Sequence, residues 1–133
     1  MPRRERNLPP AVLSHEEAER VMMQPDLETP VGIRDRAVLE TFYSSGVRRQ
    51  ELTRLKVGDL DAERKTVFVR QGKGKKDRLL PIGERAIVWI EKYLEEARPR
   101  LVQGTDEGWL FLTTLGEQLG VDWLTHRVRE YVK

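Results

Sequence analysis

Hydrophobic residues recur at every third or fourth position in several stretches of the chain, which is the period of a helix with one buried face. These stretches are residues 14–23, 33–46, 48–55, 84–98 and 121–133. In the first stretch, Ser14 and Glu17 have the S-x-x-E spacing of a capping box. Gly46 follows the second stretch, where a helix would stop. The pattern therefore predicts three helices in the first part of the chain and two in the last.

Between the third and fourth helical stretches the hydrophobic period changes to two. Residues 65–71 place Val67 and Val69 on one face, as a strand does. Residues 77–83 predict a shorter second strand, so the two form a hairpin. Residues 109–114, a short apolar run, fit a buried strand or turn. This order predicts an α+β fold, mainly helical with a small antiparallel sheet.

Composition limits the possible classes of protein. The 133 residues suffice for one domain, and 38% hydrophobic with 35% charged residues is typical of a soluble globular protein. No run approaches the roughly 18 apolar residues of a membrane span, and residues 1–10 lack the apolar segment of a secretory signal. The absence of cysteine excludes a disulfide framework and a thiolate metal site. We therefore expect a cytoplasmic protein that does not contact a membrane.

Positive charge is concentrated in two segments. Residues 62–78 hold seven Lys or Arg against two acidic residues, a balance of +5, whereas the whole chain has a net charge of +2. Residues 1–7 add three Arg against one Glu. Such segregation is typical of a surface that binds an anionic polymer, most often nucleic acid. A solvated hairpin tip without a partner explains the charge equally well.

Other chemistries find little support in the sequence. Residues 72–77, GKGKKD, lack the third glycine of G-x-G-x-x-G and the spacing of a P-loop. His15 and His126 are the only histidines and have no further ligands at metal-binding spacing, so no metal site is predicted. Core or helix-capping roles are our interpretation of the three tyrosines, and core or partner-facing roles that of the three tryptophans.

Two segments together resemble the tyrosine site-specific recombinase, or phage integrase, family, and most closely its Xer-type branch. Residues 43–61, YSSGVRRQELTRLKVGDLD, contain a G-x-R-x-x-E-L box, and residues 69–83, VRQGKGKKDRLLPIG, contain a G-K-G-x-K-x-R turn. The matching positions are Gly46, Arg48, Glu51 and Leu52, then Gly72, Lys73, Gly74, Lys76 and Arg78. The two boxes in this order are specific, although either alone would be weak.

The resemblance implies cleavage of DNA by a tyrosine, through a 3′-phosphotyrosyl intermediate and without metal, ATP or another small-molecule cofactor. It casts Arg48 as a catalytic arginine and Lys73 as the general acid for the leaving 5′ oxygen. Glu51 and Asp59 are expected to bond backbone groups near helix ends. Further predicted DNA phosphate contacts are Arg49, Lys75, Lys76 and Arg78. The implied partners are double-stranded DNA and other recombinase protomers.

The resemblance divides the chain into a linker-like lead-in, residues 1–13, and a partial catalytic domain, residues 14–133. A second box, His-x-x-Arg, and then the nucleophilic tyrosine are expected beyond Lys133. Tyr131 precedes that box, so it is not expected to be the nucleophile. We therefore expect a DNA-binding recombinase segment that is inactive alone. A non-enzymatic DNA-binding remnant or regulator, and a small α+β interaction domain, are the alternatives.

Overall fold

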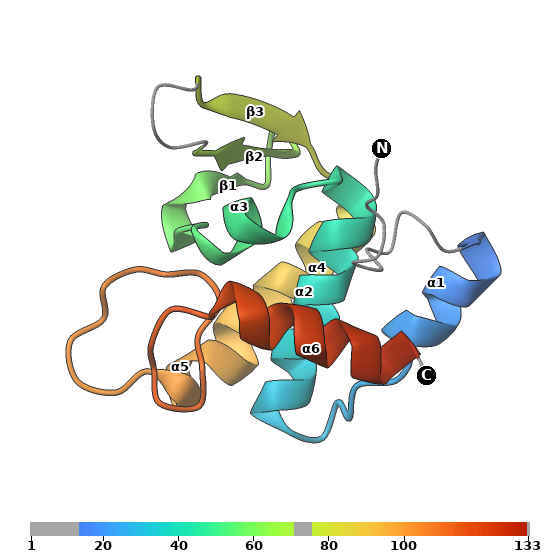
Figure 1. Cartoon of the computed structure of the whole chain (residues 1–133). Helices are drawn as coiled ribbons and strands as arrows, with labels where there is room; N and C mark the ends of the chain where they lie inside the picture. Colours follow the sequence, from blue (N-terminus) through green and yellow to red (C-terminus); the bar gives the residue numbers. More distant parts are fainter. Residues whose placement is uncertain (1–13, 71–75, 133) are drawn as a thin grey trace.

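The computed structural model of the chain describes residues 14–70 and 76–132 (Figure 1). Its elements are α1 His15–Met22, α2 Pro30–Ser45, α3 Arg49–Thr53, η3 Val57–Asp59, β1 Leu60–Asp61, β2 Thr66–Val69, β3 Arg78–Pro81, α4 Glu84–Lys92, η4 Tyr93–Ala97, α5 Arg98–Leu101 and α6 Val121–Val132. The predicted α+β class and the order of the elements are confirmed. No helix in these ranges is long and apolar enough to span a bilayer.

The helix α2 lies at the centre of the fold, and α1, α3, α4 and α5 all pack against it (Figure 1). It begins after Thr29, whose side chain accepts a hydrogen bond of 2.9 Å from the Gly32 N–H, with Pro30 in the first turn. It ends at Gly46, whose φ of +72° is the left-handed conformation of a helix end. The capping signals of the sequence therefore place both ends of the central helix.

Every residue of α2 from 32 to 42 is buried, whereas the sequence predicted one buried stripe. The additional buried side chains carry charges: they are Arg34, Asp35, Arg36 and Glu40. Each is paired, as buried charges must be. Glu40, for example, accepts bonds from Arg36 Nε at 2.9 Å and from Arg85 Nε on α4 at 2.8 Å.

The sheet has the order β1-β2-β3 and is antiparallel throughout. Val67 pairs with Leu80 and Val69 with Arg78. Val67 and Val69 are fully buried and Phe68 is half-buried on the opposite face, as the alternation predicted. The short strand β1 was not expected from the sequence. It forms because Leu60 and the residue after it pair with the start of β2.

The helix predicted at 84–98 continues to Leu101 and contains a π-helical turn, η4. Around this turn the side chains of Tyr93 and Arg98 both contact the apolar run at 109–112. The Tyr93 hydroxyl donates to the Leu110 carbonyl at 2.7 Å and accepts from the Leu112 N–H at 3.1 Å. Because these carbonyls and N–H groups are buried, their satisfaction by Tyr93 holds the run in the core.

The aromatic residues divide between the core and cation contacts. Tyr93 is buried as predicted, but Tyr43 is exposed and its hydroxyl lies 2.8 Å from His15 Nδ1, so the core or capping prediction is wrong for Tyr43. Each tryptophan ring lies against a cationic side chain: Trp89 against Arg36, Trp109 against Lys56 and Trp123 against Arg34. The rings therefore cover arginine and lysine groups that the sequence did not link to them.

Candidate nucleic-acid interface

Arg48 is the N-cap residue of α3 and follows α2 after only two residues. The left-handed Gly46 turns the chain out of α2, and the buried Val47 fixes the backbone directly before Arg48. The Arg48 side chain is nevertheless 70% exposed. The fold thus holds the backbone of this arginine in place while its guanidinium group faces solvent.

Glu51 lies beneath Arg48 and binds three groups with one buried carboxylate. Its Oε1 accepts the Arg48 N–H at 2.9 Å, and its Oε2 lies 3.3 Å from Arg48 Nη1. Arg78 of β3 donates to both oxygens, at 2.8 and 3.2 Å. Burial alone raises the pKa of Glu51, but the bonds from Arg78 and Arg48 outweigh it and the pKa is lowered. The predicted backbone-capping role of Glu51 is confirmed.

Asp59, the last residue of η3, makes a second connection of the same kind, in this case to the residue that follows β2. Its Oδ2 accepts the Lys56 N–H at 2.7 Å, which confirms the predicted capping role of Asp59. The same oxygen accepts a bond from Arg70, the residue that follows β2. This bond raises the pKa of Arg70. Both strands of the hairpin are therefore joined to capped helical turns.

The lysines predicted to contact phosphate lie between the two strands. Lys76 is exposed, two residues before the start of β3. Lys73 and Lys75 lie outside the described residues, so the catalytic role of Lys73 and the phosphate contact of Lys75 stay predictions.

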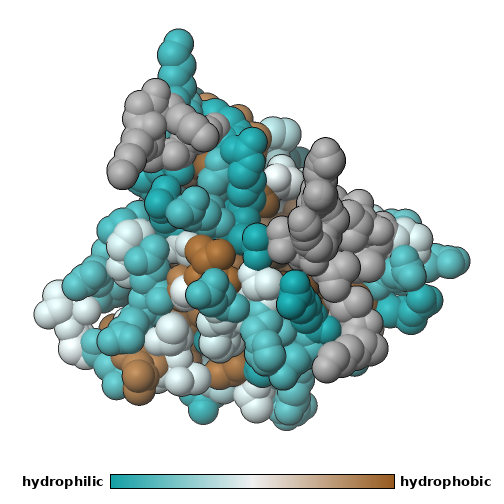
Figure 2. Space-filling model, in the orientation of Figure 1, coloured by the Kyte–Doolittle hydropathy of each residue, from teal (hydrophilic) through white to brown (hydrophobic). Residues whose placement is uncertain are grey.

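The face of the molecule in Figure 2 is mostly hydrophilic, with hydrophobic side chains gathered in small patches.

Arg49 joins α3 to the last helix. Its Nη1 donates to the hydroxyl of Thr125 on α6, and that hydroxyl donates in turn to the Val121 carbonyl at 3.1 Å. Arg49 is half-buried in this position. Its predicted role as a phosphate contact is not tested by this arrangement, in which the guanidinium group supports the packing of α6 beside α3.

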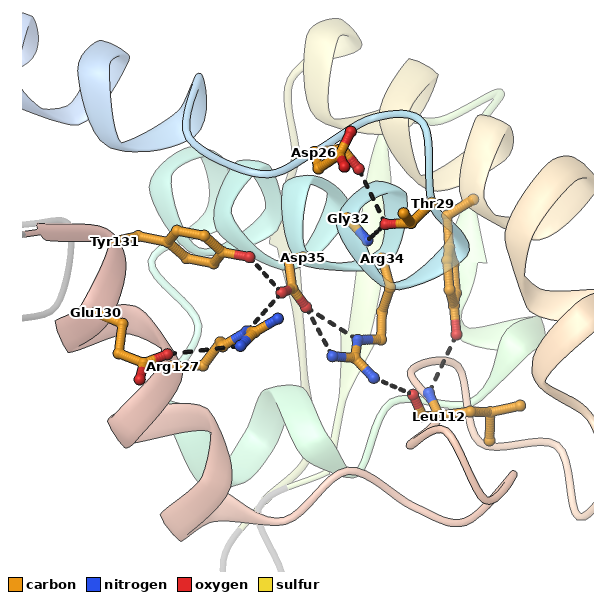
Figure 3. Close-up of polar contacts among 10 residues, drawn as sticks. Asp26, Thr29, Gly32, Arg34, Asp35, Leu112, Arg127, Glu130 and Tyr131 are labelled. Carbon is orange, nitrogen blue, oxygen red and sulfur yellow. Dashed lines mark hydrogen bonds and ion pairs between the residues drawn. The ribbon is translucent and has the colours of Figure 1, made fainter.

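The carboxylate of Asp35, on α2, anchors α6 through two side chains (Figure 3). Its Oδ2 accepts bonds from Arg127 Nε at 2.9 Å and from the Tyr131 hydroxyl at 2.6 Å. Its Oδ1 accepts from Arg34 Nε at 3.0 Å, and Arg34 also donates to the Leu112 carbonyl at 2.9 Å. One buried carboxylate thus joins the central helix to α6 and, through Arg34, to the apolar run.

This network sets the chemistry of Tyr131. Burial and the bond to Asp35 both raise the pKa of the Tyr131 hydroxyl well above its ordinary value. A phenol held in this way stays protonated and donates to a carboxylate; that Tyr131 is not the nucleophile stays a prediction. The sequence analysis missed the network, although two arginines and an aspartate within an apolar helix, at 34–36, were a signal for it.

Within residues 14–70 and 76–132, no group of three or more His, Asp or Glu side chains is placed to hold a metal ion. Positive charge at the interface is supplied by arginine and lysine side chains. Arginine is suited to this task because its planar guanidinium group stays protonated and can bond two oxygens of one phosphate.

The fold and the two boxes define a class of DNA recombinases. The model of the Phage integrase family matches residues 11–133, and the chain belongs to this family. It corresponds to the N-terminal part of a tyrosine recombinase catalytic domain. The predicted family resemblance is therefore confirmed.

Individual relatives are Xer-type recombinases. The chain is 44% identical over 133 residues to tyrosine recombinase XerC 2 of Ralstonia nicotianae, covering 100% of this chain and 38% of that protein. It is 38% identical over 124 residues to XerD of Pseudomonas aeruginosa, covering 93% of this chain and 41% of that protein. The chain thus spans about two fifths of the length of these relatives.

Solved structures of Xer recombinases are similar to this chain in fold. The crystal structure of XerA recombinase matches with a TM-score of 0.77 and 28% identity, over 90% of this chain and 40% of that one. XerH site-specific recombinase matches with a TM-score of 0.69 at 22% identity, over 90% of this chain and 35% of that one, and this likeness concerns the fold alone.

Proposed function

We propose that this chain is the DNA-binding first part of a tyrosine recombinase catalytic domain, with Arg48 and Lys73 as two of its catalytic residues. The observation that carries the proposal is the exposed Arg48 guanidinium group, whose backbone is fixed by the buried Glu51 at 2.9 Å. Glu51 is in turn bonded to β3 of the lysine-bearing hairpin. XerH, which shares the fold, was crystallised with its difH substrate in pre-cleavage and post-cleavage complexes.

The proposed chemistry follows from the residue types. A guanidinium group can meet two non-bridging phosphate oxygens at once, where charge develops during phosphoryl transfer. In other phosphoryl transfers such an arginine contributes about 10³ to 10⁵ in rate. Lys73 would donate a proton to the leaving 5′ oxygen. Lys75 and Lys76 would bind flanking phosphates and position the duplex without reading its sequence.

We further propose that the 133 residues alone bind DNA without cleaving it, with no metal or small-molecule cofactor. None of the tyrosines matches the position of the family's nucleophile, and the Tyr131 hydroxyl is bonded to Asp35. Incubation with a nicked suicide substrate should therefore give no covalent protein–DNA adduct. An adduct at Tyr131 would contradict this assignment. Association with other recombinase protomers and a cytoplasmic location belong to the same proposal.

A salt titration of duplex binding tests the DNA-binding proposal. Contact with about three phosphates predicts a log–log slope of affinity against salt near −2.7. Lys73→Ala and Lys76→Ala should each make the slope shallower by about 0.9. Lys92→Ala is the matched control, because Lys92 lies on α4 in an ion pair with Glu96, and it should leave the slope unchanged. A slope near zero in the unmodified chain would instead favour an interaction domain that does not bind DNA.

A further inference from the structure

The basic residues of the hairpin fall into two groups when their partners are considered. Five of the seven Lys and Arg at positions 62–78 lie in the part of the chain that the structure describes, and four of these five form ion pairs. These pairs are Arg64 with Asp61, Lys65 with Glu84, Arg70 with Asp59, and Arg78 with Glu51. The fifth is Lys76, whereas Lys73 and Lys75 lie outside the described residues. Much of the positive charge in this segment is therefore neutralised within the protein.

Two of these pairs flank the segment that carries the lysines. Arg70 follows β2 directly, and Arg78 is the first residue of β3, so they stand at the two sides of its base. Their partners are buried: the Asp59 side chain is 7% exposed and the Glu51 side chain is 6% exposed. Each carboxylate also caps a helical turn, since Asp59 accepts the Lys56 N–H and Glu51 the Arg48 N–H.

We propose that Arg70 and Arg78 are positioning residues that fix the base of the hairpin to the capped turns beside Arg48. The inference rests on the proposed function, and it changes the role predicted for Arg78 from phosphate contact to anchor. Moving Arg78 onto a phosphate would remove both of its bonds to the buried Glu51 carboxylate and leave only the 3.3 Å contact with Arg48 Nη1, which is unfavourable. Phosphate contact then falls to the lysines, and the strand ends on either side of their segment are held at a fixed place relative to Arg48.

The geometry explains why arginine stands at position 78. Its guanidinium group reaches both oxygens of Glu51, at 2.8 and 3.2 Å, so two bonds fix the orientation as well as the distance. Glu51 Oε2 also lies 3.3 Å from Arg48 Nη1. A lysine would supply only a point charge and could not bond both carboxylate oxygens in this planar arrangement. One carboxylate therefore links the hairpin strand to the proposed catalytic arginine.

Salt titration on duplex DNA separates the two roles. Substitution of a cation that binds phosphate lowers the magnitude of the slope by about 0.9, as expected for Lys76→Gln. Arg78→Gln and Arg70→Gln should leave the slope at its unmodified value, even where they weaken affinity. If each of these two substitutions lowers the slope by about 0.9, the arginines are phosphate contacts and the proposal is wrong.

Amide hydrogen exchange is measured without DNA, so loss of a residue that only contacts phosphate would leave the exchange rates unchanged. Arg78→Gln and Glu51→Gln should each accelerate exchange of the amides of β2 and β3, whereas Lys76→Gln should not. The double variant should exchange no faster than Glu51→Gln alone, because that substitution already weakens the bond that Arg78→Gln removes. Unchanged exchange in Arg78→Gln would overturn the anchoring role. Should that variant not fold, Arg78→Lys answers the same question: faster exchange supports the fork, and exchange at the unmodified rate contradicts it.

The salt titration and the exchange experiment together distinguish failure of the anchoring role from failure of the proposed function. If the unmodified chain shows no salt-dependent binding to duplex DNA, the proposed function fails, and the exchange experiment still decides whether the arginines anchor the hairpin. If DNA binding is present but exchange is unaffected by Arg78→Gln and Arg78→Lys, the anchoring role fails alone.

Discussion

Arg127 Nε lies 2.9 Å from Asp35 Oδ2 and joins α6 to the central helix across 92 residues of sequence. Tyr131, one turn further along α6, donates to the same oxygen. On the other side of the carboxylate, Arg34 is almost completely buried. The position of α6 beside α2 therefore depends on one negative charge that compensates two arginines.

Asp35→Asn should destabilise the chain by about 3–5 kcal/mol, the usual cost of breaking a buried ion pair by removing one partner. The amide keeps the shape of the side chain but leaves the buried Arg34 without its counter-charge and Arg127 with only Glu130, at 3.5 Å. Tyr131→Phe should cost only about 1 kcal/mol, because it removes a single hydrogen bond. Urea unfolding followed by circular dichroism measures both changes.

Glu91→Gln provides the matched control for the Asp35 substitution. Glu91 is exposed on α4, and the same loss of one negative charge there should change the free energy of unfolding by less than about 0.5 kcal/mol. An Asp35→Asn variant as stable as Glu91→Gln would show that the network contributes no net stability, and the anchoring of α6 would then rest on apolar packing.

Gly46 is the second position at which a small substitution should have a definite cost. Its φ of +72° is unfavourable for any residue with a Cβ atom, so Gly46→Ala should destabilise by about 1–2 kcal/mol. Gly46→Asn should cost less, because asparagine tolerates this conformation. Gly58→Ala, at a position without a positive φ and with open space around the Cβ, is the control in the same unfolding measurement. Equal stability of the Ala and Asn variants at 46 would contradict the backbone explanation.

The predictions from sequence succeeded where the physical cause is local. Helical and strand periods, the capping of α1 by Ser14 and the helix end at Gly46 depend on residues a few positions apart. The contact of Glu51 with the Arg48 N–H is local in the same way, at a separation of three residues. The pattern of the first box was therefore sufficient to predict this contact.

The sequence did not reveal features whose cause is distant in sequence. Tyr93, the first residue of the π turn at 93–97, bonds residues 17 and 19 positions away. The Arg78 fork spans 27 residues and the Tyr131 bond to Asp35 spans 96. A charge pattern cannot show which cation reaches which carboxylate, so phosphate contacts and internal ion pairs looked alike in the sequence.

Asp106 allows a prediction about pH. Two bonds from Arg98, at 2.7 and 2.8 Å, lower the pKa of this carboxyl from 3.8 to about 2. A carboxyl group whose pKa is lower in the folded than in the unfolded state stabilises the fold at pH values above the unfolded-state pKa. This stabilisation is lost as the pH falls through the folded-state pKa. The stability difference between the unmodified chain and Asp106→Asn should therefore be constant above the unfolded pKa and shrink between pH 3.8 and about 2.

Nuclear magnetic resonance titration of the Asp106 carboxyl carbon measures this pKa directly. Arg98→Lys should move the midpoint upward, toward 3.8, because lysine cannot make both bonds. A midpoint that stays at the same pH in Arg98→Lys would mean that another group, such as the Gly108 N–H that also bonds the carboxylate, sets the pKa.

Arg48 and Arg78 share the Glu51 carboxylate, but we expect opposite effects from their removal. The Arg48 side chain is 70% exposed and its guanidinium group lies at 3.3 Å from Glu51, whereas Arg78 makes two bonds. Arg48→Ala should therefore change the free energy of unfolding by less than about 0.5 kcal/mol. On duplex DNA it should make the salt slope shallower by about 0.9, and Arg48→Lys should keep the slope, because the slope counts charges.

The comparison variant is Arg64→Ala, which removes an arginine that is 82% exposed and paired with Asp61 in the turn between β1 and β2. It should leave both stability and salt slope unchanged, because this turn lies before β2, at the opposite end of the strand from Arg70. If Arg48→Ala behaves like Arg64→Ala on DNA, Arg48 does not reach a phosphate in this chain. If Arg48→Ala instead unfolds the protein, its contact with Glu51 is structural, and the exposed guanidinium group is not available for catalysis.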